Sequence, residues 1–278
     1  MRPVGRGSKL LYLLVGSLFL IGTATINLDF VYRFTSSDLA PGATTMPQRF
    51  GVGVQSVAWA DKRQQGDDIE LSIVIDDFDD LDLEEFPKSW KAWRGDDELA
   101  REIYTIKEEE ENRYLQAIDD GSSIIIRKRL RMWNANEYPI LSWRWRARIL
   151  PEAGDESVGS KNDSSVAVYV VLDQNFIGVP KTLKYVWSTT LPVGTYHRRD
   201  GIGRPHVIVL ESGKEKLGQW VEESVDVYTD YVRIFGDNPP QKAVGIGVLT
   251  DGNATGTDSQ GDYDDFVVHR RDIYPVTR

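Results

Sequence analysis

The feature that most constrains the fold is a succession of short segments between residues 69 and 269 in which apolar and polar side chains alternate. A period of two residues is typical of a β-strand with one buried face, and turn residues separate the segments. About ten such segments, with at most one helical segment at Val227–Phe235, predict an all-β fold. We expect a jelly-roll β-sandwich of the galactose-binding or concanavalin-like kind. The predicted strands lie within Glu70–Asp80, Glu102–Lys107, Arg113–Ala117, Ser123–Leu130, Pro139–Leu150, Ser164–Leu172, Thr182–Ser188, His206–Glu211, Trp220–Val227, Val244–Leu249 and Tyr263–Val268.

The N-terminal segment has the pattern of an export signal. Arg2, Arg6 and Lys9 precede Leu10–Ile26, a run of 17 apolar or small residues. A basic start followed by such a run predicts a signal peptide or an uncleaved signal anchor. We therefore expect a periplasmic or extracellular protein that contacts the inner membrane only if this segment is retained. The expected organisation is a leader at 1–33, a tether at 34–68, one sandwich domain at 69–270 and a tail at 271–278.

Charge and composition exclude several classes of function. The formal net charge is −10, although the leader is basic, so the body of the chain repels phosphate backbones and nucleic acid is not an expected partner. The absence of cysteine excludes disulfides, thiolate zinc sites and a lipid-modified cysteine. The sequence has no nucleophile elbow, phosphate loop or zinc signature.

A row of arginines is the first candidate site. In Pro139–Leu150, Arg144, Arg146 and Arg148 alternate with Trp143, Trp145 and Ala147, so the three arginines share one face of a strand. Two interpretations remain open. The row is a cationic floor for an anionic ligand, or it forms ion pairs with the many carboxylates of this chain.

A glycine-rich loop near the C-terminus is the candidate metal site. Asp251, Asn253 and Thr255 occupy loop positions 1, 3 and 5, Gly256 occupies position 6, and Asp262 occupies position 12. This is the donor spacing of a calcium-binding loop, although strands rather than helices flank it. The alternative is a turn closed by hydrogen bonds between its own side chains and backbone.

Acidic side chains also cluster at both ends of the predicted domain. Asp76, Asp77, Asp79 and Asp80 follow the first strand, and Asp262, Asp264 and Asp265 lie in the last. If the two strands are neighbours, these carboxylates meet, which requires a cation or raised pKa values. Otherwise they form two separate solvated rims.

Aromatic and histidine side chains complete the candidates for ligand binding. Tryptophan and tyrosine rings, Tyr185 among them, stack on sugar faces, but they also fill the cores of sandwiches. The polar stretch Tyr196–Arg199 contains His197 and holds a base and charged groups of the kind that polysaccharide β-elimination needs. Two carboxylates across a cleft would instead hydrolyse a glycoside.

Several motifs together resemble a bacterial, exported family known as domain of unknown function 3047. They are LSWRWRA at 141–147, YVV at 169–171, TLKYVWS at 182–188, VIVLESG at 207–213, GQW at 218–220, DVYTDY at 226–231, IFG at 234–236, GIGVLTDGNATG at 245–256 and YDDF at 263–266. The resemblance implies an exported single domain of jelly-roll type, whose sandwich relatives commonly bind carbohydrate. It implies no established reaction.

The chain departs from the pattern of this family at three places. Ala167 stands where the family has an arginine, Val225 and Asp226 replace an arginine–asparagine pair, and Asn253 and Ala254 replace an aspartate–asparagine pair. If the family's arginines line a ligand site, this member has changed its ligand or lost it.

Three functions follow as hypotheses. The first is a non-catalytic module outside the cytoplasm that binds glycan or another ligand of the cell envelope. The second is a polysaccharide lyase or glycoside hydrolase in the same fold. The third is a structural or protein-binding domain of the envelope, which a flat apolar patch would favour.

Overall fold

The computed structural model of the chain describes residues 44–45, 71–93, 95–130, 132–175 and 177–271. The predicted leader, most of the predicted tether and most of the predicted tail lie outside these residues. In the part of the chain that is described, no helix combines the length and the apolar character needed to cross a membrane.

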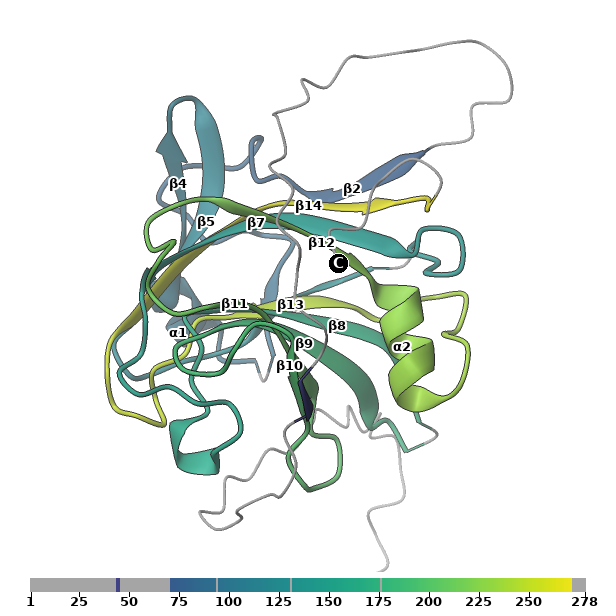
Figure 1. Cartoon of the computed structure of the whole chain (residues 1–278). Coiled ribbons are helices and arrows are strands. Elements are labelled where there is room, and N and C mark those ends of the chain that lie inside the picture. The colour runs from purple at the N-terminus through teal and green to yellow at the C-terminus, as the bar shows by residue number, and fades with distance from the viewer. Residues whose placement is uncertain (1–43, 46–70, 94, 131, 176, 272–278) are drawn as a thin grey trace, which may run out of the picture.

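Two packed β-sheets make up the fold, which confirms the expected jelly-roll sandwich (Figure 1). In the described part of the chain, the larger sheet, sheet A, has eight strands in the order β1-β10-β11-β9-β8-β13-β6-β3. Its strands are β1 (Thr44–Thr45), β3 (Lys91–Ala92), β6 (Ile126–Arg129), β8 (Val166–Gln174), β9 (Pro180–Ser188), β10 (Thr195–His197), β11 (His206–Ser212) and β13 (Gly245–Leu249).

The smaller sheet, sheet B, has the order β12-β7-β14-β5-β4, with β2 also paired to β14. β2 near the start of the domain therefore lies beside β14 at its end, with Phe266 opposite Asp76. This is the arrangement in which the first and last strands are neighbours. The strands of sheet B are β2 (Ser72–Asp76), β4 (Tyr104–Glu109), β5 (Asn112–Asp119), β7 (Ile140–Ile149), β12 (Val221–Asp226) and β14 (Ser259–His269).

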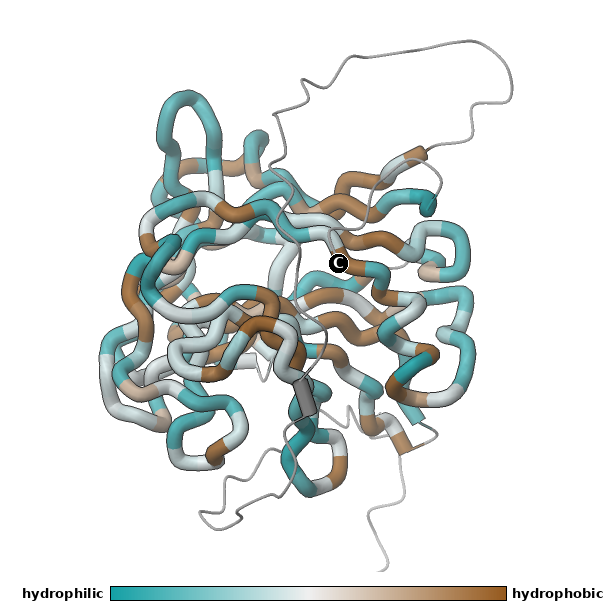
Figure 2. The backbone as a smooth tube through the Cα atoms, in the orientation of Figure 1, coloured by the Kyte–Doolittle hydropathy of each residue, from teal (hydrophilic) through white to brown (hydrophobic). Residues whose placement is uncertain are grey.

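The core lies between the sheets and follows the alternation in the sequence. On β7, Trp143 and Trp145 are fully buried and meet Tyr185 and Trp187 of β9, with ring centroids 5.7 Å and 6.4 Å apart. Figure 2 shows that most hydrophobic residues lie along strands of the sandwich, whereas the connecting loops are mostly hydrophilic. Because successive side chains of a strand point to opposite faces, each sheet also has an outer face, and these faces hold the candidate sites.

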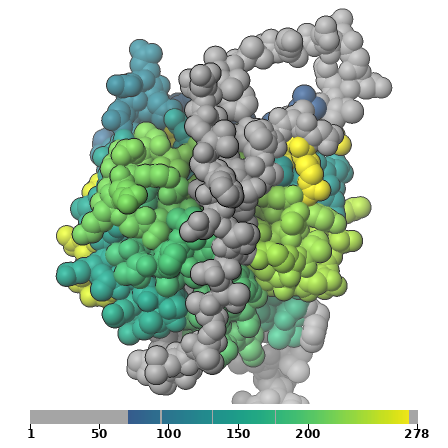
Figure 3. All heavy atoms as spheres, in the orientation of Figure 1, coloured from purple at the N-terminus to yellow at the C-terminus, as the bar shows by residue number. Residues whose placement is uncertain are grey.

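β4 and β5 form a projecting hairpin, and the run of glutamates Glu108–Glu111 lies at its turn (Figure 3). Its turn residues Glu110 and Glu111 both have positive φ, 54° and 66°. That conformation matches the two-residue turns that join twisted antiparallel strands. The charged turn is exposed, as a run of like charges requires.

The helix predicted at Val227–Phe235 is present as α2, with the same bounds. The Asp226 side chain caps its N-terminus by accepting the Thr229 N–H at 2.9 Å, and Gly236, at φ +77°, ends it. α2 packs on strands of both sheets, contacting β7 and β9 (Figure 1).

A second helix, α1 (Asp97–Ile103), corrects the prediction of at most one helix and shortens the strand predicted from Glu102. Asp96 caps α1 by accepting the Leu99 N–H at 3.2 Å, and acidic residues occupy its first turn. A helix of seven residues is too short to show a clear helical period in the sequence, so its only signal is the capping aspartate.

Candidate functional site

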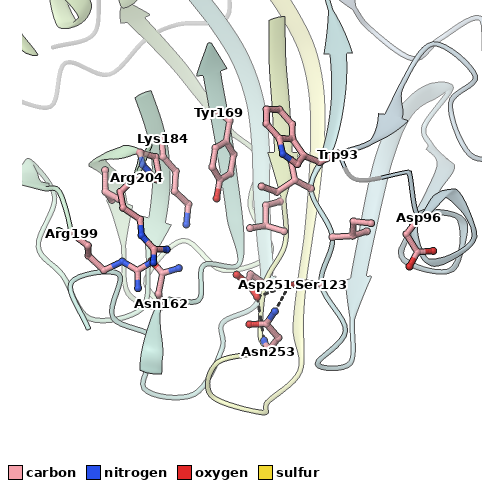
Figure 4. Close-up of a pocket in the computed structure, with 15 residues that line it drawn as sticks. Trp93, Asp96, Ser123, Asn162, Tyr169, Lys184, Arg199, Arg204, Asp251 and Asn253 are labelled. Carbon is pink, nitrogen blue, oxygen red and sulfur yellow. Dashed lines mark hydrogen bonds between the residues drawn. The ribbon is translucent and has the colours of Figure 1, made fainter. Parts of the chain in front are cut away.

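A pocket of about 290 Å³ lies on the outer face of sheet A (Figure 4). Its floor consists of outward-facing side chains of four neighbouring strands: Tyr169 of β8, Lys184 of β9, Val207 of β11 and Leu249 of β13. The strand register brings them together, because Lys184 is opposite both Tyr169 and Val207. In sheet A, β11 lies between β9, to which it is parallel, and β10. The β10–β11 loop therefore reaches the pocket from the β10 side of the sheet.

The walls of the pocket differ in chemistry. Trp93, which follows β3, stands on one side, and Arg199, Arg204 and Asn162 stand on the other (Figure 4). Arg127 packs on the Trp93 ring, with its guanidinium carbon 4.8 Å from the ring centroid. The remaining lining residues are Asp96, Ser123, Ile124, Ile125, Pro205, Asp251 and Asn253.

Asp251 supplies a buried carboxyl group at the edge of the pocket. Its Oδ1 accepts hydrogen bonds from the Ser123 hydroxyl at 2.7 Å and from the Asn253 N–H at 3.2 Å. Burial, and next the nearby Asp163, raise the pKa of Asp251 to about 7. A carboxyl group with such a pKa exchanges its proton near neutral pH, which is the property that a general acid or base needs.

A chain of buried polar groups lies behind Lys184. Its Nζ donates to the Ser164 hydroxyl at 3.3 Å, and that hydroxyl donates to Glu156 at 2.8 Å. The Ser188 hydroxyl donates to the other oxygen of Glu156 at 2.6 Å. Burial lowers the pKa of Lys184 and raises that of Glu156, while the attraction between the two opposes both changes. These hydrogen bonds fix the position of the Lys184 side chain, whose Nζ lies 5.5 Å from the Tyr169 ring centroid.

The loop after β13 is held closed by hydrogen bonds from outside it. Asp163 accepts the backbone N–H groups of Ala254 and Thr255 at 3.1 Å and 2.7 Å, and also the Thr255 hydroxyl at 2.7 Å. Asp119 accepts the Gly252 N–H at 2.7 Å. A Cβ at Gly252 would lie 1.9 Å from the Thr257 carbonyl oxygen, so this tight turn requires glycine.

These contacts correct the donor set proposed for calcium. Asp251, Asn253 and Thr255 share the loop, but Asp262 lies within β14, opposite Arg146. A strand advances about 3.3 Å per residue, so the chain leaves the loop at Ser259 and carries Asp262 away from it. Among the described residues, no group of three or more His, Cys, Asp or Glu side chains is placed to hold a metal ion. Calcium binding by the loop stays a prediction.

The arginine row lies on the outer face of sheet B, and none of its members lines the pocket. Arg146 and Arg148 both donate from Nε to Asp262 at 2.6 Å, and Arg146 also reaches Glu109 at 2.8 Å. The structure thus places the row in ion pairs, as the alternative interpretation required. Only 5% of Arg146 is exposed, so this guanidinium is not an open floor for a ligand.

The acidic ends of the domain also meet on this face. Arg144 bridges Asp264 and Asp265, with both N–O distances 2.6 Å. Burial, and next Asp265, raise the pKa of Asp264 to about 7. Asp76 instead accepts hydrogen bonds from Lys128 and from the Trp90 indole, at 2.6 Å and 2.7 Å. Burial raises the pKa of Asp265, and the nearby Asp79 and Asp77 add to this rise, so carboxylates of the two ends do lie near one another. Arg144 is the cation beside them.

Tyr185 and His197, the other expected ligand residues, do not line the pocket. Tyr185 is fully buried between the sheets, where its hydroxyl donates to Asp230 at 2.8 Å, so it belongs to the core. His197 lies on β10 opposite Val207, beside the pocket, and only 4% of it is exposed. Burial, and next Arg199, lower the pKa of His197.

The sequence held two signals for the pocket that the prediction did not use. Tyr169 interrupts an otherwise apolar strand, and Lys184 places a charge within a strand that is buried along most of its length. A polar side chain in a central strand marks a place where the outer face is covered or lined by other groups. Trp93 and Arg204 carried no such signal, because loops bring them to the pocket.

The model of the family described as "Protein of unknown function (DUF3047)" matches residues 88–267, and the chain belongs to this family. This match confirms the resemblance drawn from the sequence motifs. No curated protein matches the chain.

Several solved structures are similar to the chain in fold. One is the family 11 carbohydrate-binding module of the cellulosomal cellulase Lic26A-Cel5E of Clostridium thermocellum, with 8% identity, a TM-score of 0.38, and coverage of 72% of this chain and 94% of that one. The family 30 module of the same organism's Cel9D-Cel44B has 9% identity, a TM-score of 0.39, and coverage of 73% and 99%. The carbohydrate recognition domain of Emp47p has 11% identity, a TM-score of 0.37, and coverage of 74% and 99%. At these values the likeness concerns the sandwich architecture only.

Proposed function

We propose that this DUF3047 protein is a glycan-binding module and that the pocket on the outer face of sheet A is its binding site. The observation that carries the proposal is the combination of Trp93 on one wall with polar and charged groups on the opposite wall, above a floor that includes Tyr169. The C–H faces of a sugar stack on aromatic rings, while its hydroxyl groups need hydrogen-bonding partners around its edge.

The size of the pocket sets the expected extent of the ligand. A volume of about 290 Å³ is at the lower end of the range for small-ligand sites, which suits a short portion of a glycan, about one or two sugar units. The strands fix the floor, and hydrogen bonds hold Asp251 and Lys184 in place, so the site is formed before the ligand arrives. In a preformed site, few side chains and loops have to be ordered on binding, so the entropic cost is small.

The proposal includes a location outside the cytoplasm. It is supported by the basic start and apolar run of residues 1–26. A reporter that is active only after export, fused behind Asp68, tests this location. Activity of a cytosolic reporter in the same fusion, with no activity of the exported reporter, would contradict it.

Affinity electrophoresis tests glycan binding directly. The wild-type protein is run through gels containing soluble neutral or acidic polysaccharides, beside Trp93→Ala and Trp220→Ala. Trp220 is a matched control, because it is half-buried on the outer face of sheet B, where it packs on Arg146 at 4.4 Å. We expect at least one polysaccharide to retard the wild type and Trp220→Ala but not Trp93→Ala. Equal migration of all three proteins in every gel would overturn the proposal.

A second candidate function, cleavage of the bound glycan, is favoured by one observation, the Asp251 carboxyl at the pocket with a pKa of about 7. A group with this pKa is suited to donate or accept a proton during hydrolysis or β-elimination. The test is the release of reducing ends and of unsaturated uronate absorbance from each polysaccharide that binds. Product formed by the wild type and lost in Asp251→Asn would support catalysis, and binding without product would leave the module non-catalytic.

A further inference from the structure

We infer that the sugar bound in this pocket carries a carboxylate, which lies against the wall formed by Arg199, Arg204 and Asn162 while the ring lies against Trp93. This inference rests on the proposed function and names the class of its ligand, an acidic sugar such as a uronic acid. Figure 4 shows the two arginine side chains and the Asn162 amide on the same side of the pocket, opposite Trp93.

The fold builds this wall from two loops. Arg199 and Arg204 are the two arms of the β10–β11 loop, which reverses direction at Gly201 and Gly203, with φ of +122° and +71°. Only glycine adopts such backbone angles readily, so the reversal that brings both arginines to one wall is encoded locally. A Cβ at Gly201 would lie 3.3 Å from Arg204 Nε, which shows how closely the turn and this side chain pack.

The second loop supports the first. Asn162 follows the short 3-10 helix η1 (Gly159–Lys161), and its amide group lines the same pocket. A Cβ at Gly159 would lie 3.3 Å from Arg199 Nη1, so the missing side chain at Gly159 leaves the space that this guanidinium occupies. The wall is therefore a packed surface rather than two extended side chains in solvent.

The chemistry of the wall matches a carboxylate. A guanidinium presents its N–H groups in a planar fork that pairs with both oxygens of a carboxylate, and it remains charged at every physiological pH. A neutral sugar has no group that needs two such forks. Hydrogen bonds from charged donors to a carboxylate are also about twice as strong as those between neutral groups, so the wall separates an acidic sugar from its neutral counterpart.

The acidic groups that line the pocket already have partners. Asp251 accepts the Ser123 hydroxyl and the Asn253 N–H, and Asp96 caps α1 by accepting the Leu99 N–H. Lys184 on the floor adds a third cationic side chain, which Glu156 balances from behind through Ser164. Asp251 and Asp96 thus make these hydrogen bonds to groups outside the arginine wall.

The charge of the whole molecule limits which acidic glycan is suitable. With a formal net charge of −10, the chain repels a long polyanion, and salt screens this repulsion only beyond about 8 Å at physiological ionic strength. An isolated acidic unit in an otherwise neutral glycan has one carboxylate for the wall and little further charge to be repelled. We expect it to bind better than a run of consecutive uronates.

Matched sugar pairs test the inference. Saturation-transfer NMR titrations compare the methyl glycosides of glucose, galactose and mannose with those of glucuronate, galacturonate and mannuronate. Trigalacturonate serves as the polyanion, and acetate alone serves as the anion without a sugar. We expect at least one acidic glycoside to bind about tenfold or more tightly than its neutral partner, which corresponds to about 1.4 kcal/mol. Acetate should bind far more weakly than that glycoside.

Variants of the loop assign the preference to the wall. Arg199→Gln and Arg204→Gln should each reduce the acidic-to-neutral ratio to less than about threefold, without lowering the affinity for the neutral glycoside by the same factor. Arg198→Gln is the control, because Arg198 is an exposed arginine of the same loop that contacts the Gly201 carbonyl and does not line the pocket. It should keep the wild-type ratio.

The failures of the two proposals are distinguishable. Equal affinity of the wild type for both members of every pair, a preference for the neutral member, or an equal loss of preference in Arg198→Gln would overturn the acidic-sugar inference and leave glycan binding intact. Acetate binding as tight as the acidic glycoside would also overturn it, since the wall would then be an anion site without sugar recognition. Glycan binding itself fails only if no sugar binds and Trp93→Ala behaves as the wild type does.

Discussion

The two outer faces of the sandwich carry the same kinds of side chains and use them differently. On sheet B, arginines alternate along one strand, and carboxylates of the neighbouring strand pair with them, as Arg146 pairs with Asp262. On sheet A, the arginines stand on a loop and face an aromatic wall across a pocket. Arginine, carboxylate and tryptophan are therefore not a sign of a site by themselves. On sheet B, strand register brings the arginines and carboxylates into ion pairs. On sheet A, loops hold arginine and tryptophan side chains around a pocket.

The difference has a physical reason. Side chains on adjacent strands are about 5 Å apart and lie in fixed register, so opposite charges there meet whenever the sequence allows it. A loop that crosses the end of a sheet sets its side chains at a distance from the strand floor, and a cavity remains between them. The following predictions test this division between a structural face and a binding face.

The largest effect is expected at Asp262. Its carboxylate is fully buried and pairs with both Arg146 and Arg148, so Asp262→Asn leaves two guanidinium groups without their shared counter-charge. Breaking a buried pair in this way costs about 3–5 kcal/mol. Urea unfolding measures the loss, and the affinity of the pocket for its glycan should stay unchanged in the folded variant.

The control for Asp262 is Asp265→Asn, which removes a carboxylate that is 44% exposed and pairs with Arg144 on the same face. An exposed pair contributes about 1 kcal/mol or less. Equal stability losses in the two variants, or lost glycan binding in stable Asp262→Asn protein, would contradict the assignment of sheet B as the structural face.

The next effect concerns the buried chain from Lys184 to Glu156 behind the pocket. Lys184→Met and Glu156→Gln should each destabilise the protein by about 2–4 kcal/mol, because each leaves a buried group without its partner. The double variant should lose less than the sum, with a coupling energy of about 1–3 kcal/mol. Strict additivity in urea unfolding would show that Glu156 does not balance Lys184, and that the amine is available to a ligand.

A smaller, pH-dependent effect is expected at His269, at one end of sheet B. Its two ring nitrogens bond to the hydroxyls of Ser72 and Ser142 at 2.8 Å and 2.7 Å, and burial lowers its pKa to about 4. The unfolded chain takes up a proton below about pH 6.5, whereas the folded chain does not. The contribution of His269 to the free energy of unfolding is therefore complete above about pH 6.5, and it falls by up to about 3 kcal/mol as the pH approaches 4.

A comparison of the wild type with His269→Asn isolates the pH-dependent contribution of His269 to stability. Asp264, with a pKa raised to about 7, acts in the opposite direction, because its folded state binds the proton more readily and gains stability as the pH falls from 7 toward 4. Unfolding free energies at pH 4.5, 5.5 and 7 should show the wild type losing its advantage over His269→Asn on acidification. A constant difference between the two proteins would contradict the lowered pKa.

The smallest effect is expected from calcium. The loop after β13 offers Asp251, Asn253 and Thr255, but hydrogen bonds to Ser123 and Asp163 already engage oxygens of Asp251 and Thr255. A weak site at tenfold excess of the ion would contribute about 1.4 kcal/mol, so we expect a shift of the melting temperature below about 2–4 °C between calcium chloride and chelator. A larger shift that Asp251→Ala removes would establish calcium at this loop. A shift that survives the substitution would place the ion elsewhere.

Much of the fold was predictable from residue alternation. The strand Ile140–Ile149 and the helix Val227–Phe235 follow from local patterns. The sequence left open whether the first and last strands are neighbours, and the structure pairs them. The helix Asp97–Ile103 and the three-residue strand Thr195–His197 were missed, because elements this short have too few residues to show a period. Of the candidate site residues, Asp251 and Asn253 line the pocket on sheet A, whereas the arginine row lies on sheet B, in ion pairs.

What the sequence by itself determined is which side chains share a face. The alternation of Trp143, Trp145 and Ala147 with three arginines assigns one set to the core and the other to the outer face of the sheet, since successive residues of a strand point in opposite directions. What only the tertiary structure decided is what each outer face meets. Asp262 lies 116 residues from Arg146 and pairs with it, whereas Trp93 and Arg199 enclose a pocket although they come from opposite edges of sheet A. Such long-range neighbours depend on strand order and loop paths, which no local pattern encodes.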